Sequence, residues 1–249
     1  PKHGWDSETT LVEIVARDMP FLVDSIHMAL SKMGYTVKFT VNIGGLGVKR
    51  DKGKIQEIYS IGHVEHGSNL EAIIQMEIDH SLNDKECQAL TEMLCVILAD
   101  VQLAVSDWGA MLNEAKLAVD ELESCGNGML NQERSESIAF IKWMCHDNFT
   151  FLGCREYDIG RDGKTMSLCL KPESGLGVLR HGPSSQHKRD YADMPKRARD
   201  LALSANNTVL IQKTNTESTV HRPGKTDCVV VKRFDKNGAL VGQRCFIGL

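Results

Sequence analysis

The sequence predicts an α+β chain of two small domains. Residues 1–80 show strand and helix signals in the order β-α-β-β-β, and a long segment with apolar residues at helical spacing follows. After a polar stretch, the remaining residues show the order α-β-β-α-β-β-β. The 249 residues fit one large or two smaller domains at ~100–200 residues each, and a hydrophobic content of 42% excludes wholesale disorder.

The opening elements follow from local patterns. Residues 9–16 are rich in β-branched side chains that alternate at period two, which predicts a strand. Residues 21–33 place apolar side chains on one face at helical spacing, and Gly34 is a typical helix stop. Strands are then expected at residues 35–43, 55–64 and 70–78, with a hairpin turn at residues 51–54.

Residues 81–123 predict one long connecting helix. Ten apolar residues recur there at steps of three and four: Leu90, Leu94, Ile97, Val101, Ala104, Trp108, Met111, Ala115, Ala118 and Leu122. At 1.5 Å per residue the helix would be roughly 55–60 Å long, with Gly109 as its only weak point. A helix of this length more often bridges two domains or a subunit interface than lies on one sheet.

The second half predicts a smaller α+β domain. A linker rich in Ser, Gly, Asn and Glu is expected at residues 124–135, and the second domain at residues 136–249. Within it we expect helices at residues 137–145 and 196–204, and a basic surface loop within residues 180–199. Strands are expected at residues 149–157, 166–171, 208–213, 228–234 and 240–247, with one turn at Asp162-Gly163.

Composition excludes several classes of function. With 29 basic and 33 acidic side chains the formal charge is -4, so no nucleic-acid partner is expected. The eight cysteines lack a CxxC spacing, and together with the absence of an N-terminal apolar segment they indicate reduced thiols of a cytoplasmic protein. No run approaches the ~18 consecutive apolar residues of a membrane span, so no membrane partner is expected. Because the chain begins at Pro1 and ends in an apolar, strand-like run, we expect a piece of a longer protein.

No catalytic, cofactor-binding or metal-ligating residue can be assigned from the motifs. Gly44, Gly45 and Gly47 lie inside a strand pattern, which is typical of bulges and not of a phosphate-binding loop. The local clusters of metal-ligating residue types (Cys145, His146 and Cys154; His63 and His66) lack the spacing of a structural metal site. No Gly-x-Ser-x-Gly motif or activated cysteine is present.

One loop keeps a possible binding role. Residues 17–22 lead from the first strand directly into a helix, where unpaired N–H groups and the positive end of the helix dipole face the loop. A small carboxylate ligand such as a free amino acid could bind there. The residues alone favour the simpler alternative, that Asp18 caps the helix and Arg17 is solvated. The candidate effector loop consists of Arg17, Asp18, Met19, Pro20, Phe21 and Leu22.

This loop resembles that of ACT domains, whose first strand-to-helix loop commonly reads Asp-x-Pro-Gly-x-Leu. Two features depart from the pattern. Phe21 stands where the family usually has Gly, which would crowd a ligand approaching the backbone. Three strands, and not two, precede the second helix. The resemblance implies a fold more firmly than it implies ligand binding.

A longer resemblance covers nearly the whole chain. Blocks in chain order resemble the N-terminal region of the large bacterial NAD-specific glutamate dehydrogenases: His3-Gly4-Trp5-Asp6, Asp18-Met19-Pro20-Phe21-Leu22-Val23-Asp24-Ser25, Asp147-Asn148-Phe149-Thr150-Phe151-Leu152-Gly153 with Arg155-Glu156-Tyr157, Ser218-Thr219-Val220-His221-Arg222-Pro223, Val231-Lys232-Arg233-Phe234-Asp235 and Phe246-Ile247-Gly248-Leu249.

The resemblance implies an ACT-like (ferredoxin-like) domain at residues 1–80, a connecting helix at 81–123, a linker at 124–135 and a PAS-like α+β domain at 136–249. The parent enzyme would oxidatively deaminate L-glutamate with NAD, while this segment would hold no cofactor and no activity. Its expected partners are other copies of the protein, the downstream catalytic domain and an amino-acid effector. The expected function is a non-catalytic regulatory and assembly segment, and the alternative is an interaction scaffold without ligand.

Overall fold

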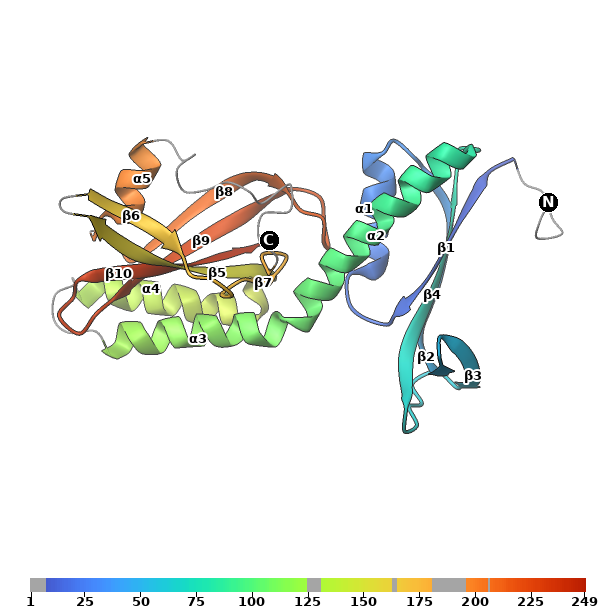
Figure 1. Cartoon of the computed structure of the whole chain (residues 1–249), viewed down its shortest axis with the longest axis horizontal. Coiled ribbons are helices and arrows are strands. Elements are labelled where there is room, and N and C mark those ends of the chain that lie inside the picture. Colours follow the sequence, from blue (N-terminus) through green and yellow to red (C-terminus); the bar gives the residue numbers. More distant parts are fainter. Residues whose placement is uncertain (1–7, 125–130, 163–164, 181–195, 206) are drawn as a thin grey trace. The chain divides into compact units, whose positions relative to one another are not determined.

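The structure is a computed structural model that describes residues 8–124, 131–162, 165–180, 196–205 and 207–249 (Figure 1). The chain divides into two compact units. One comprises Pro1–Gln102 with Thr219–Pro223, and the other comprises Leu103–Ser218 with Gly224–Leu249. Both contain antiparallel sheets with helices, so the predicted α+β class is confirmed.

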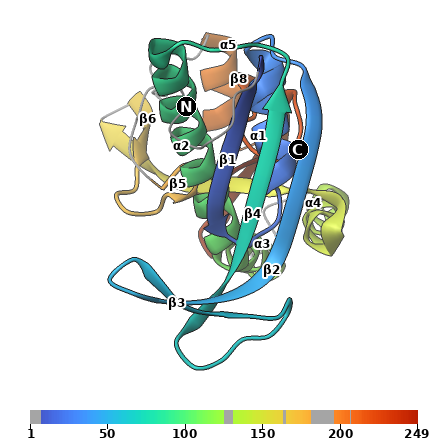
Figure 2. The same ribbon diagram turned by 90° about the vertical axis from the view of Figure 1, so that its right-hand side faces the viewer.

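The first unit is a four-stranded antiparallel sheet with helices on one face. Its strands are β1 (Thr10–Arg17), β2 (Val37–Asp51), β3 (Lys54–Tyr59) and β4 (Ser68–Ile78), in the order β1-β4-β2-β3. Figure 2 shows this sheet in front, with α1 (Leu22–Lys32) and α2 (Asp84–Ser106) behind it. Residues of alternating or helical spacing form the buried layer: Ala72, Ile74, Met76 and Ile78 of β4, Leu22, Ile26, Ala29 and Leu30 of α1, and Leu90, Leu94, Ile97 and Val101 of α2.

Three strands of this sheet have the order found in part of the ferredoxin-like pattern, and one strand is added to them. In the β-α-β-β-α-β pattern the first and third strands pair antiparallel, and the third also pairs with the second. Here β1, β2 and β4 take those three places, and β3 is an extra strand paired to the other edge of β2. Within the described residues, no strand pairs with the outer edge of β1, where the pattern places its last strand.

The strand glycines have two different roles. The register of β2 against β4 shifts between Ile43 and Leu46, and Gly45 adopts a φ of 72°, so the expected bulge is confirmed at Gly44 and Gly45. Gly47 allows a close approach of backbones, because a Cβ there would lie 2.2 Å from the carbonyl oxygen of His63.

The predicted continuous helix over residues 81–123 is wrong. The segment forms two helices, α2 and α3 (Trp108–Ser124), with Asp107 in a turn between them. The buried Asp107 carboxylate accepts the Gly177 N–H at 2.8 Å and is paired with Arg180, so tertiary partners fix the break two residues before Gly109. From Leu103 onward the segment belongs to the second unit and is not a free connector.

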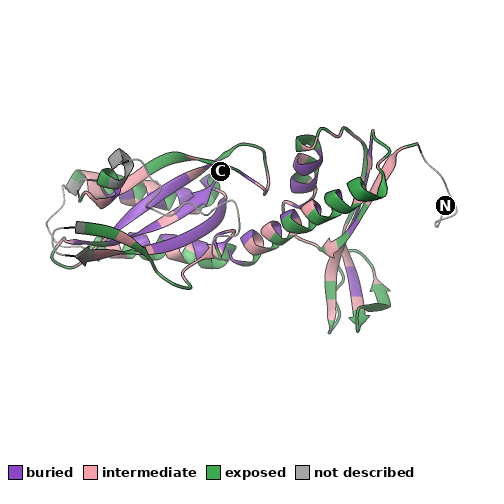
Figure 3. Cartoon of the chain, turned by 45° about the horizontal axis from the view of Figure 1, so that its top comes forward, coloured by how far each residue is buried: buried purple, intermediate pink, exposed green. Residues whose placement is uncertain are grey.

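The second unit is a six-stranded sheet that packs against two helices. Its central order is β6-β5-β10-β9-β8, and β7 pairs with β5. The elements are α4 (Asn131–Trp143), the π-helical turn η1 (Met144–Asn148), β5 (Phe151–Asp162), β6 (Thr165–Leu170), β7 (Leu176–Gly177), α5 (Lys196–Leu203), β8 (Val209–Glu217), β9 (Lys225–Phe234) and β10 (Leu240–Gly248). The central strands are largely buried (Figure 3).

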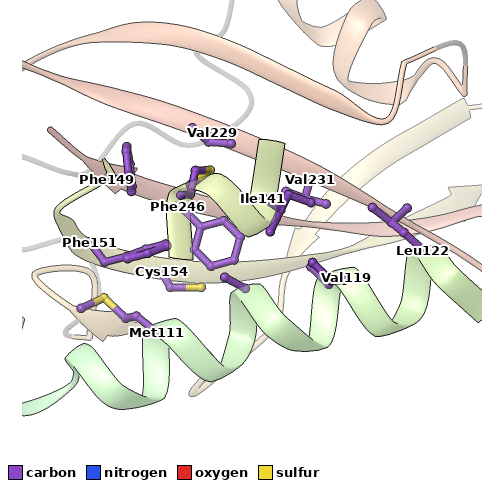
Figure 4. Close-up of a cluster of buried hydrophobic side chains, with 13 residues drawn as sticks. Met111, Val119, Leu122, Ile141, Phe149, Phe151, Cys154, Val229, Val231 and Phe246 are labelled. Carbon is purple, nitrogen blue, oxygen red and sulfur yellow. The ribbon is translucent and has the colours of Figure 1, made fainter. Parts of the chain in front are cut away.

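Its main core lies between α3, α4 and one face of the sheet. Figure 4 shows Phe246 of β10 at the centre of this cluster, among side chains from α3, α4, β5 and β9. The ring of Phe151 packs edge-on to Phe246, with ring centroids 5.7 Å apart. The alternation of β10 places Phe246 and Arg244 on this face and Gln243 and Cys245 on the other.

Several expectations fall partly or wholly outside the described residues. These are the block at residues 3–6, residues 125–130 of the expected linker, the turn at Gly163 and most of the basic run within 180–199. The expectation of a linker up to residue 135 is wrong, because α4 begins at Asn131. Among the described helices, α2 is long and apolar enough to cross a membrane, with a mean hydropathy of 1.7 over 18 residues. Core helices of water-soluble proteins pass the same test, so this composition is weak support for a membrane span.

Candidate functional site

A pocket of about 170 Å³ lies where β1 leads into α1. Its lining comes from the β1–α1 loop, the first turn of α1 and two neighbouring strands: Asp18, Met19, Phe21, Leu22, Val23, Asp24, Asn42 and Ala72. Four of the six predicted effector-loop residues therefore line one pocket. Asn42 and Ala72 were missed, because they are brought there by the sheet and not by the loop sequence.

The first turn of α1 has no side-chain cap. Its N-cap residue is Phe21, and no side chain hydrogen-bonds there. The interpretation that Asp18 caps the helix is therefore wrong. The N–H groups of Leu22, Val23 and Asp24 precede the first full turn and lack intrahelical partners. Together with the helix dipole they favour a negatively charged ligand group at this end of the pocket.

Two carboxylates give the same pocket an acidic side. Asp18 is held by a hydrogen bond from its own N–H to the Leu70 carbonyl, at 2.9 Å. Its carboxylate lies over Gly44, so that a Cβ at Gly44 would be 3.2 Å from Oδ2. Asp24 is on the first turn of α1. A pocket with helix N–H groups and two carboxylates suits a zwitterion, whose carboxylate and ammonium groups need opposite partners.

Phe21 is held in an unusual conformation by the segment Thr219–Pro223 of the same unit. Its φ is 71°, in the left-handed region that glycine favours and a phenylalanine rarely adopts. Its ring packs against the imidazole of His221. The backbone N–H of His221 donates a hydrogen bond to the hydroxyl of the fully buried Ser25, at 2.9 Å. The ring of Phe21 thus forms part of the pocket wall and also a contact with a distant segment of sequence.

Arg17 and Pro20 do not line this pocket. Arg17 lines a separate depression of about 530 Å³, together with Arg50 and Glu71. There the Arg50 guanidinium makes two hydrogen bonds to the Glu71 carboxylate, at 2.7 and 2.8 Å. Alternation along β1 explains the separation, because consecutive residues of a strand point to opposite faces of the sheet.

The second unit contains a dense ion-pair network among its described residues. Arg244, with a side chain that is 5% exposed, pairs with Glu114 at 2.8 Å, Glu121 at 2.9 Å and Glu156 at 2.6 Å. Burial alone would raise the pKa of Glu156, but the Lys171 hydrogen bond and the Arg244 charge hold it below its usual value. These charges satisfy one another, which is typical of a structural network and not of acid–base catalysis.

Neither unit, as far as it is described, gathers three or more His, Cys, Asp or Glu side chains that could hold a metal. Burial raises the pKa of the Cys154 thiol well above its usual value, so this thiol is not an activated nucleophile. The His146 imidazole contacts the Lys142 carbonyl at 2.5 Å within its own helix region.

The comparisons with known proteins agree with this geometry. The family model for the glutamate dehydrogenase ACT1 domain matches residues 1–94. Residues 1–94, which make up most of the first unit, are therefore similar to the ACT1 domain of glutamate dehydrogenases.

The whole chain also matches two curated relatives. It is 31% identical over 250 residues to the NAD-specific glutamate dehydrogenase of Halomonas elongata, and 31% identical over 254 residues to that of Pseudomonas aeruginosa. Each alignment covers 100% of this chain and 15% of the relative. The chain is thus similar to an N-terminal region of NAD-specific glutamate dehydrogenases and spans about 15% of the length of these relatives.

Proposed function

We propose that this chain is a non-catalytic regulatory and assembly segment of an NAD-dependent glutamate dehydrogenase. The whole enzyme would convert L-glutamate, NAD and water to 2-oxoglutarate, ammonia and NADH in the cytoplasm. Its nucleotide site and catalytic residues would lie outside this segment, which would bind no cofactor itself. The observation that carries the regulatory role is the pocket that combines an uncapped helix N-terminus with the carboxylates of Asp18 and Asp24.

The ligand we propose is a free amino acid. Its carboxylate would accept hydrogen bonds from the first N–H groups of α1, and its ammonium group would face Asp18 or Asp24. The Asn42 side chain can donate or accept, and Phe21, Leu22 and Ala72 supply apolar contact. A purely anionic ligand fits less well, because two carboxylates would repel it.

Regulation requires that the ligand bind one state of the protein more tightly than another. The contact between Phe21 and His221 supplies such a difference. A ligand that displaces the Phe21 ring must also break this contact and loosen the hydrogen bond to Ser25. The segment Thr219–Pro223 lies between β8 and β9 in the chain. A ligand that displaces this segment therefore acts on a part of the chain that is covalently joined to two strands of the second unit.

The second unit is, by this proposal, a PAS-like domain that assembles with the downstream catalytic domain or with other copies of the protein. An antiparallel sheet with α3 and α4 on one face supports this assignment. The buried Arg244 network supports a rigid structural role for the unit.

Isothermal titration with the common amino acids tests the ligand role. We expect saturable heat with at least one amino acid. The matched pair of variants removes one negative charge at each of two places: Asp18→Asn inside the pocket, directly after β1, and Glu13→Gln outside it, on β1. Asp18→Asn should weaken binding while Glu13→Gln leaves it unchanged. Absence of heat with every amino acid would leave only the assembly role.

The second candidate function is an interaction scaffold without ligand. It is favoured by Phe21 at the position where the family usually has Gly, and by the sheet face opposite α1 and α2. On that face Val15 is 57% exposed, Phe39 60% and Ile43 42%. The register places Val15 and Ile43 on either side of Ile73, so these three side chains form an apolar row across β1, β4 and β2, while Phe39 lies further along the same face, opposite Glu77.

Light scattering separates the two candidates. A scaffold should self-associate without added amino acid, and Val15→Lys with Phe39→Lys should shift it towards monomer. A protein that stays monomeric at all concentrations, and that binds an amino acid, would contradict the scaffold.

A further inference from the structure

Two cysteines meet on the face of the second unit's sheet opposite its main core. Cys228 lies on β9 and Cys245 on β10, which are adjacent antiparallel strands. In the register, Cys228 is opposite Ile247 and Cys245 is opposite Val230, so the two cysteines are diagonal neighbours. Their Sγ atoms are 3.0 Å apart.

We propose that Cys228 and Cys245 are a site of reversible oxidation, at which a small peroxide converts the two thiols to a disulfide. A disulfide bond is about 2.05 Å long, so the sulfur atoms need to approach by only about 1 Å. They are held on rigid, paired strands and need no loop to close over a long distance. The proximity follows from strand register and does not depend on the proposed effector role of the first unit.

The surroundings distinguish the two thiols chemically. The hydrogen-bond contact with Cys245 lowers the pKa of Cys228, burial acts to raise it, and a hydrogen bond from Gln212 lowers it further. The same contact with Cys228 raises the pKa of Cys245, and burial adds to it. Cys228 is therefore the better nucleophile and Cys245 the resolving thiol.

The charged neighbours of the pair are mixed. The Arg155 guanidinium lies near Cys245 and favours a thiolate there, while Asp227 lies near Cys228 and opposes one. The Tyr157 hydroxyl faces both sulfurs, and burial raises its pKa, so it stays neutral at neutral pH. Cys154 also lies near Cys245, but it belongs to the core face, where burial keeps it protonated.

The reaction balances with hydrogen peroxide as the oxidant. The Cys228 thiolate attacks one peroxide oxygen, an S–O bond forms, and the O–O bond breaks to release hydroxide, which is protonated to water. The Cys245 sulfur then attacks the Cys228 sulfenic acid, the S–S bond forms, and the S–O bond breaks to release a second water. The two thiols lose two electrons, and the peroxide gains them.

The burial of Cys228 limits the size of the oxidant that can reach its sulfur atom. Cys228 is only 6% exposed, so a molecule of the size of hydrogen peroxide can reach it more readily than another protein's disulfide can. Cys95 and Cys169 are exposed and are the natural competitors for larger reagents. The reduced thiols expected from the sequence are thus one of two states of this pair.

Peptide mapping of the purified protein tests the site. The protein is treated with hydrogen peroxide, remaining thiols are blocked with N-ethylmaleimide under denaturing conditions, and peptides are analysed by mass spectrometry. We expect one linked peptide pair joining Cys228 to Cys245, formed at a rate independent of protein concentration and reversed by dithiothreitol. The mapping uses the unaltered protein, so this test remains valid even if a cysteine variant does not fold.

Three cysteine variants test the role of each thiol separately. Cys228→Ala should abolish the linked pair and sulfenic acid at position 228. Cys245→Ala should leave the sulfenic acid on Cys228, which dimedone traps. Cys169→Ala, at an exposed cysteine, should leave the linkage unchanged. Full alkylation of both Cys228 and Cys245 after peroxide treatment, or linkage of Cys245 to Cys154 instead, would overturn the proposal.

Discussion

The Phe21 ring packs against the His221 imidazole, with ring centroids 4.7 Å apart and planes tilted by 45°. A second contact joins the same parts of the chain, because the backbone N–H of His221 donates to the hydroxyl of Ser25, 196 residues earlier in the sequence. The ring contact explains why a phenylalanine is kept at a φ of 71°, where the ACT pattern usually has glycine. The ring contact and the hydrogen bond offset the backbone strain of the left-handed conformation.

The backbone conformation of Phe21 leads to a prediction about two substitutions. Phe21→Gly and Phe21→Ala both remove the ring contact, but only glycine adopts a positive φ without strain. The glycine variant should therefore be more stable than the alanine variant by about 1 kcal/mol. Urea unfolding of the two variants measures the difference. Equal stability, or a more stable alanine variant, would show that residue 21 leaves the left-handed region.

Arg244 should be indispensable for the stability of the second unit. Arg244→Met leaves three glutamates without their central cation, among them Glu156, whose side chain is 7% exposed. The expected loss of unfolding free energy is about 3–5 kcal/mol. Lys49→Met removes the cation of an exposed pair with Glu57 and should change stability little. Similar losses for the two variants in chemical denaturation would contradict a structural role for the buried network.

Lys232 gives the protein a pH dependence of known sign. Its ammonium group donates to the carbonyls of Leu201 and Ser204, and burial lowers its pKa to about 8, although Glu133 acts to raise it. In the unfolded chain the pKa is close to the ordinary value of about 10.4. Between about pH 8 and 10.4 the unfolded chain therefore binds more protons than the native protein.

The stability of the native protein relative to Lys232→Met should consequently rise with pH across this window. Below about pH 8 both states of the wild type are protonated at this position, and the difference between the two proteins should be constant. Unfolding free energies of both proteins at several pH values test this. A difference that does not change up to pH 10 would place the native pKa of Lys232 at its ordinary value.

Asp107 should determine where α2 ends and α3 begins. Asp107→Ala leaves the buried Gly177 N–H without its acceptor and removes the partner of Arg180. A loss of about 2 kcal/mol is expected, in the range for an unsatisfied buried donor. Asp120→Ala, at an exposed position on α3, is the matched control and should be near neutral. Thermal unfolding with equal effects for both variants would contradict the assignment.

Local patterns predicted the elements of the first unit well. Period-two alternation identified β1 and β4, and helical spacing with Gly34 identified α1. The β2–β3 turn at residues 51–54 was also expected, and Asp51 pairs with Lys54 across it. These features depend on residues that are close in the sequence, so they can be predicted from the sequence alone.

The remaining features depend on partners far apart in the chain. The break at Asp107 is fixed by Gly177 and Arg180, some 70 residues later, while the helical spacing on both sides of it continues undisturbed. The pocket needs Asn42 and Ala72 from β2 and β4, and strand alternation places Arg17 away from it. The pairing of Cys228 with Cys245 requires the register of β9 against β10, which spacing in the sequence does not specify.

The central claim is that an amino acid binds at the first turn of α1, and backbone amide NMR tests it most directly. In a titration of the isotope-labelled protein with individual amino acids, the account predicts that the largest chemical-shift changes fall on the amides of Leu22, Val23 and Asp24. Smaller changes should follow at His221, through its contact with Phe21. Saturable shifts that leave these amides unmoved, or no shifts with any amino acid, would contradict the claim.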